Sequence, residues 1–179
     1  FKVGGTEVTG MDHDEIVQMI VSVLSVEVIC KRAFPDINAK DDKGKTALMN
    51  AAKNGNPGTI EVLLDHHADV HAEDDLGKTA FIYTAENGND DHIQAMQLLL
   101  ENSAAININF KAKDGKTALI HAAKMGKVKA VDMLLAKGAG VNAKDKDGMT
   151  ALMNAAENGD TNMVKVLLES GKKITTTLA

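Results

Sequence analysis

The sequence predicts an all-α solenoid, in which helix-turn-helix units joined by short β-hairpin loops stack side by side. Three observations predict it. The phrase GKTALMNAAKNG at 44–55 recurs with small changes at 77–88, 115–126 and 148–159. The copies start at intervals of 33, 38 and 33 residues, and periods of this length are typical of stacked helical units. A Leu pair follows each copy, at 63–64, 99–100, 134–135 and 167–168.

Each copy of the phrase contains the start and stop signals of one helix. A Thr precedes a run of Ala and Leu, and its hydroxyl can accept a hydrogen bond from the first free amides of a helix. A Gly follows about two turns later, where the left-handed conformation that ends many helices favours it. We therefore predict four first helices, each lying between such a Thr and such a Gly: Thr46 and Gly55, Thr79 and Gly88, Thr117 and Gly126, and Thr150 and Gly159.

A second helix is predicted in each unit between the closing Gly and the next loop. In the first unit it begins at Asn56-Pro57, where Pro at the first helical position loses no needed hydrogen bond, and in the last unit it begins at Asp160. Ile60, Leu63 and Leu64 have the spacing of one buried helical face. The second unit carries five extra residues in its second half, where stacked units tolerate insertions. A lone unit would leave its apolar faces wet, so neighbouring units must cover them.

The repeated unit resembles the ankyrin repeat. The segment 41–52 is similar to the family's opening D-x-x-G-x-T-P-L-H-x-A-A, and 138–143 is similar to its closing G-A-D-V-N-A. The family's Pro is Ala in all four units and its His is Met or Ile, so apolar contacts must replace the hydrogen bonds of that His. These replacements resemble bacterial members of the family. The resemblance implies repeats at 41–73, 74–111 (with the insertion), 112–144 and 145–177, after an N-terminal capping helix or degenerate repeat at 1–40 and before a tail at 178–179.

Both ends of the chain differ from a plain internal repeat. Between Asp12 and Ala33, polar residues spaced three and four apart predict one polar stripe along an otherwise apolar helix. In the last unit, residues 163–168 keep the apolar pattern of an internal unit, although terminal repeats need a polar outer face. We expect either a trimmed chain, as a first residue Phe1 also suggests, or a cover supplied by the tail or by a partner.

Composition restricts the classes of partner. The 179 residues include 20 basic and 25 acidic side chains, for a net charge of −5, and no basic stripe that would attract nucleic acid. The single cysteine excludes an intramolecular disulfide framework. The most apolar stretch, 16–30, is interrupted by polar residues and is too short to span a bilayer. We expect a cytoplasmic protein, with export after removal of a signal as the alternative.

The sequence offers no catalytic constellation, and we expect no enzymatic activity and no cofactor. Gly-Lys-Thr at 44, 77 and 115 is similar to the end of a phosphate-binding loop, but the required earlier Gly is replaced by Ala39, Ala72 and Phe110. Histidines and carboxylates gather between 65 and 71 in a loop, without the fixed spacing of a metal site. We interpret them as solvated loop residues and expect no metal.

The remaining candidate is a protein-binding surface. In the ankyrin family, partners commonly bind the concave side, which is built from hairpin tips and the exposed positions of each first helix. Most of these positions are polar here, and interface anchors are typically apolar or aromatic groups surrounded by polar ones. Tyr83 and His121 occupy the same place in adjacent units, so we expect them to be neighbours. The candidate protein-binding residues are Leu76, Tyr83, His121, Lys124, Met125 and Met149.

Other interpretations of these residues and of the chain stay open. Leu76 and Met149 are alternatively residues that pack against adjoining hairpins, and Tyr83 covers a helix junction. The leading hypothesis is a non-enzymatic scaffold that binds another protein and is itself a monomer. The alternatives are a targeting fragment of a larger protein whose enzymatic domain lies elsewhere, and a structural array that self-associates weakly through its last repeat.

Overall fold

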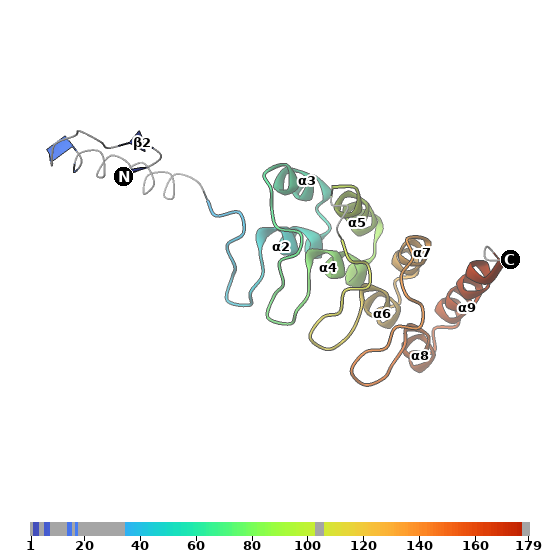
Figure 1. Ribbon diagram of the computed structural model, residues 1–179. Coiled ribbons are helices and arrows are strands. Elements are labelled where there is room, and N and C mark those ends of the chain that lie inside the picture. The colour runs from blue at the N-terminus through green and yellow to red at the C-terminus, as the bar shows by residue number, and fades with distance from the viewer. Residues whose placement is uncertain are drawn as a thin grey trace. The chain divides into compact units, whose positions relative to one another are not determined.

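The computed structural model describes residues 2–3, 6–7, 14–15, 17, 35–102 and 106–176 (Figure 1). The chain divides into two compact parts, Phe1–Asp36 and Ile37–Ala179; the word unit is kept for the repeats. In the first part, β1 (Lys2–Val3) pairs with β2 (Thr6–Glu7) in an antiparallel register that places Lys2 opposite Glu7. This pairing was not predicted from the sequence. Residues 14, 15 and 17 are helical, and the rest of the helix predicted between Asp12 and Ala33 lies outside the described residues.

The described residues of the second part form eight helices in two rows, which Figure 1 shows nearly end-on. The inner row consists of α2 (Ala47–Asn54), α4 (Ala80–Asn87), α6 (Ala118–Lys124) and α8 (Ala151–Glu157). The outer row consists of α3 (Pro57–Asp65), α5 (Asp90–Asn102), α7 (Val128–Ala136) and α9 (Thr161–Thr176). Each helix packs against the next helix of its own row and against its partner in the other row. The predicted all-α solenoid is confirmed.

Each inner helix begins directly after its predicted Thr, and three of the four Thr side chains cap the helix. The hydroxyl oxygens of Thr46, Thr117 and Thr150 accept hydrogen bonds from backbone amides three residues later, at 3.3, 3.4 and 3.2 Å. Thr79 has the same extended backbone at the start of α4, but its side chain makes no capping hydrogen bond. The helix ends also follow the prediction, because Gly55 and its three counterparts are left-handed, with φ between 55° and 69°.

The loops between units are short and are closed across their turns by backbone hydrogen bonds, as predicted for hairpin loops; Asp41 N, for example, donates to Lys45 O at 2.9 Å. Within 35–102 and 106–176 they are turns, without assigned strands. A backbone hydrogen bond joins each loop to the next: Asp75 N donates to Lys43 O at 3.1 Å, Lys113 N to Leu76 O at 3.0 Å and Lys146 N to Asp114 O at 3.1 Å. Since one such bond per junction does not extend into a ladder, the tips stack without becoming a β-sheet. In Figure 1 the loops project from the inner row in one direction.

The core lies between successive units. Met49, Ile82 and Ile120, which replace the family's His, are buried in the interfaces, so apolar contact substitutes for hydrogen bonding there. Met153 has the same place in the last unit and is 49% exposed. The insertion in the second unit lengthens its outer helix, since α5 has 13 residues whereas α3 and α7 have 9 each.

Candidate protein-binding face

The loops are held in shape by aspartates at their first positions. Each of Asp41, Asp74 and Asp145 accepts two backbone hydrogen bonds through one carboxylate oxygen, from the residues two and four places later, at 2.8–3.0 Å. For Asp41, these backbone bonds hold the pKa below its usual value. The third loop has Ala112 at this place and depends instead on Asp114, whose carboxylate accepts from the amide of Lys116 at 3.0 Å. Three of the four loops therefore have the same local scaffold.

Tyr83 is buried on the inner helix α4 and is bonded to the loop before it. Its hydroxyl donates to Oδ2 of Asp74 at 2.5 Å. The ammonium groups of Lys45 and Lys78 lie 5.1 and 5.6 Å from the centre of its ring, within the range of cation–π attraction. Burial, together with the bond to the Asp74 carboxylate, raises the pKa of Tyr83 well above its usual range. Tyr83 is thus a neutral donor that fixes the loop against α4.

Glu86 joins two successive units. Its Oε1 atom lies 2.6 Å from Nζ of Lys78 and 2.9 Å from Nδ1 of His121. Burial opposes ionisation of this carboxyl group, but the hydrogen bonds from His121 and Lys78 outweigh burial, and the pKa of Glu86 lies below its usual value. A carboxylate only accepts hydrogen bonds, so Nδ1 of His121 carries a hydrogen.

The other ring nitrogen of His121 is buried and unpaired. Its Nε2 atom has no hydrogen-bond partner among the described residues, and the nearest carboxylate oxygen, Oδ1 of Asp114, is 3.9 Å away. The repeat explains this. His121 is nine residues after Ala112, as Tyr83 is nine residues after Asp74. The carboxylate of Asp74, which accepts the hydrogen bond of the Tyr83 hydroxyl, therefore has no counterpart at Ala112 in the loop before His121.

A second cluster of charged side chains, centred on Lys116, reaches the last unit. Its Nζ atom lies 3.1 Å from Oδ2 of Asp114 and 3.4 Å from Oδ2 of Asp145. Although burial acts in the opposite sense, the bonds with Lys116, together with backbone bonds, lower the pKa of both carboxyl groups. The two carboxylates in turn raise the pKa of Lys116 against the effect of burial. The loops and inner helices of three units are therefore held by two ionic clusters, here together called the ionic network. One contains Lys78, Glu86 and His121, and the other contains Asp114, Lys116 and Asp145.

The six candidate residues differ in how far their side chains are exposed to solvent. Tyr83 and His121 are buried and are linked through Lys78 and Glu86. Leu76, at a loop tip, is 58% exposed, and Met125, at the end of α6, is 56% exposed. Lys124 is exposed and Met149 is half-buried. Sequence reasoning missed the ionic role of Glu86, although the repeat places it three residues after Tyr83 and one unit before His121.

The structure gathers no metal-ligating group in the parts it describes. There, no three His, Cys, Asp or Glu side chains are placed to share an ion. His66, from the predicted loop cluster, contacts the backbone oxygen of Val62 through Nδ1 at 2.8 Å. No described helix combines the length and the apolar composition needed to cross a membrane.

Comparison with known families decides the classification. A family model described as ankyrin repeats (3 copies) matches residues 10–110 and 91–177. The chain belongs to the ankyrin-repeat family. Among curated proteins the comparison found no match. Ankyrin repeats are generally protein-interaction modules and are typically non-enzymatic.

Proposed function

We propose that this ankyrin-repeat protein is a non-enzymatic scaffold that binds another protein through its loop tips and inner helices, here called the inner face. The observation that carries the proposal is the exposure of Leu76 and Met125, both more than half exposed and each preceded in sequence by a charged residue, Asp75 or Lys124. Large apolar side chains ringed by polar groups are the usual anchors of protein interfaces. Four units, with the boundaries expected from the sequence, supply this face.

The ionic network beneath the anchors supports the same function. Lys78 and His121 bond Glu86, and in the second cluster Lys116 bonds Asp114 and Asp145, so most of these charges are paired within the face. A surface whose side chains are already ordered loses less conformational entropy when a partner binds. We expect the apolar anchors to contribute most of the affinity, and the network to hold the geometry in which they are presented.

A pair of photo-crosslinking variants tests the proposal. A benzophenone amino acid replaces Leu76 on the inner face in one variant and Val62 on the outer helix α3 in the other; Val62 is also 58% exposed. In native extract, we expect position 76 to capture a protein that position 62 does not. With that protein purified, Leu76→Ser combined with Met125→Ser should weaken binding at least tenfold, and Val62→Ser should not. Equal capture at both positions, or unchanged affinity of the double variant, contradicts the proposal.

A second candidate function is self-association through the last unit. Met153 and Leu168 are 49% and 53% exposed, whereas the counterparts of Met153 in the internal units are buried and those of Leu168 are half-buried. Two copies could cover each other's last unit, although we propose a monomer at low concentration. Sedimentation velocity over a hundredfold concentration range tests this. Met153→Lys with Leu168→Lys should abolish a concentration-dependent increase in mass, while Val62→Lys should leave it; a constant monomer mass contradicts self-association.

A further inference from the structure

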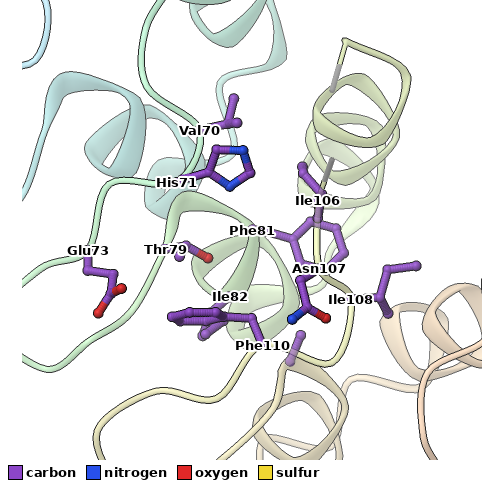
Figure 2. A pocket seen from close by; sticks show the side chains of 11 residues that line it. Val70, His71, Glu73, Thr79, Phe81, Ile82, Ile106, Asn107, Ile108 and Phe110 are labelled. Atoms are coloured by element: carbon purple, nitrogen blue, oxygen red, sulfur yellow. The ribbon is translucent and has the colours of Figure 1, made fainter. Parts of the chain in front are cut away.

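A small cavity lies in the second unit, next to the end of the first, and shares no lining residue with the network and anchors of the inner face. Its volume is about 130 Å³. Figure 2 shows side chains from three places converging on it: the segment 70–73 before α4, the start of α4 itself, and the segment 106–110 before α6. Its walls are mostly apolar, with Val70, Phe81, Ile82, Ile106, Ile108 and Phe110 among them.

The aromatic walls of this cavity are departures from the repeat. Phe81 stands where the other units have Leu48, Leu119 and Leu152. Phe110 stands where they have Ala39, Ala72 and Ala143. Both aromatic rings thus occur in the second unit only, with Phe81 at the start of α4 and Phe110 after the lengthened α5. Places where a regular pattern breaks are where a specialised site is expected.

A missing contact between loops accompanies these rings. At two other junctions an Asn side chain joins neighbouring segments: Asn38 Oδ1 accepts from the amide of Asp69 at 2.8 Å, and Asn109 Oδ1 from the amide of Gly140 at 2.7 Å. His71 takes the place of this Asn at the cavity. Across the described residues of this junction, no equivalent bond joins His71 to Asn107. The two segments are therefore not tied together at the cavity.

Thr79 supplies a polar atom to the same cavity. Its counterparts Thr46, Thr117 and Thr150 use their hydroxyls to cap their own helices. The side chain of Thr79 makes no capping bond, is buried, and lines the cavity. The hydroxyl that serves the helix elsewhere can therefore serve a bound group here.

We propose that this cavity is a binding site for one compact apolar group that carries a hydrogen-bonding atom. An apolar cavity of about 150 Å³ accommodates a benzene molecule, so 130 Å³ suits a single ring or a branched aliphatic group. The apolar part contacts Phe81 and Phe110, and the polar atom bonds the hydroxyl of Thr79. A free small molecule and a side chain of a bound protein both offer this chemistry.

Titration of the full chain with two probes tests the site and distinguishes these sources. Phenol represents a free small molecule, and N-acetyl-leucinamide represents a side chain on a peptide. We expect saturable changes in the NMR signals of Ile82, Ile108 and Phe81. A response to phenol alone assigns the site to small molecules, a response to N-acetyl-leucinamide alone assigns it to a partner's side chain, and a response to both supports the shared chemistry.

Matched variants test the role of each wall. Thr79→Val should weaken the binding of the responding probe about five- to tenfold through the lost hydrogen bond, and should leave the binding of toluene within twofold. Thr46→Val alters the equivalent hydroxyl away from the cavity and should leave both affinities unchanged. Ile108→Trp should fill the cavity from its rim and abolish binding, while a thermal melt confirms that the variant folds.

The proposal is overturned if neither probe changes these signals up to its solubility limit. It is also overturned if the changes persist in a folded Ile108→Trp variant, because the probe would then be bound elsewhere. Since no residue of the cavity belongs to the pair Leu76 and Met125, failure here leaves the proposed protein-binding function standing, and the reverse is also true.

Discussion

His121 of α6 is bonded through Nδ1 to Oε1 of Glu86 in α4 at 2.9 Å, while its Nε2 atom is buried and has no hydrogen-bond partner in the part of the chain that the structure describes. Tyr83, at the equivalent place one unit earlier, has its polar atom fully engaged by Asp74. The two side chains show how one repeat position can join units in different ways. Tyr83 bonds to its own loop, whereas His121 bonds to the preceding unit.

Stability should depend on pH through Glu86. Its pKa in the folded protein is lowered from an ordinary value of 4.5, so its contribution is complete above about pH 4.5 and is lost as pH falls through the lower folded value. We expect urea denaturation to show falling stability in this acidic range. Glu86→Gln should lose about 1–3 kcal/mol at pH 7, and its stability should fall less steeply between pH 5 and 3.

The control for this experiment is Glu61→Gln on the exposed side of α3, for which stability at pH 7 should change by less than about 0.5 kcal/mol. An acid profile of Glu86→Gln that is parallel to that of the parent protein would show that Glu86 does not carry the effect.

Ala112→Asp should stabilise the protein by about 0.5–1.5 kcal/mol. The new carboxylate would occupy the place of Asp74 and Asp145, which are buried to a similar degree. It would accept a hydrogen bond from Nε2 of His121 once the ring carries hydrogens on both nitrogens, since Nδ1 already donates to Glu86. Thermal and urea unfolding measure the gain. A double-mutant cycle with His121→Gln separates the two contributions, because only the bond to the ring is lost in the second background. A destabilised Ala112→Asp would refute this explanation of the unpaired nitrogen.

Gly55→Ala should destabilise the protein by more than about 1 kcal/mol. Gly55 has φ 66°, and a Cβ atom there would lie 2.6 Å from Cε1 of His92 in the next unit. The matched control is Gly58→Ala in α3, where nothing lies within 4 Å of the added atom; it should gain about 0.5–1 kcal/mol because Ala favours the helix. Differential scanning calorimetry compares them, and equal melting temperatures would contradict the prediction.

Ala151→Pro should raise stability by about 0.4–1 kcal/mol by restricting the unfolded chain. Ala151 is the first residue of α8, and Thr150 before it has φ −94° and ψ 169°, an extended conformation that is compatible with a following Pro. Ala155→Pro, in the interior of the same helix, should instead cost about 3 kcal/mol or more. A lower melting temperature for Ala151→Pro would show that the ring does not fit against α6.

Much of the fold could be predicted because its signals are local. Thr46 and Gly55 mark the limits of α2 by backbone chemistry alone, and repetition makes the same inference in each unit. The pairing of β1 with β2 was missed because two-residue strands carry almost no periodic signal. The loops were predicted as short hairpins, and each is closed by a backbone hydrogen bond across its turn, although no strand is assigned to them within 35–102 and 106–176.

The site was only partly predictable, because the solvent exposure of a side chain depends on which other residues of the fold cover it. Leu76 and Met125 were singled out for their apolar character and are exposed. Tyr83 and His121 were singled out in the same way, but both side chains are buried. Tyr83 is bonded to Asp74, and His121 is bonded to Glu86. Those bonds join residues 9 and 35 positions apart, and only a comparison between units, position by position, could have indicated them.

The exposed Met153 has a consequence for how the array comes apart. Helices α8 and α9 pack against α6 and α7 and have no following unit within the described residues. Stability in such arrays is a sum over adjoining units. Under mechanical load we therefore expect stepwise detachment beginning at this edge, so that a force trace would show a series of small ruptures and the remaining units could recapture a released neighbour when the load is relaxed.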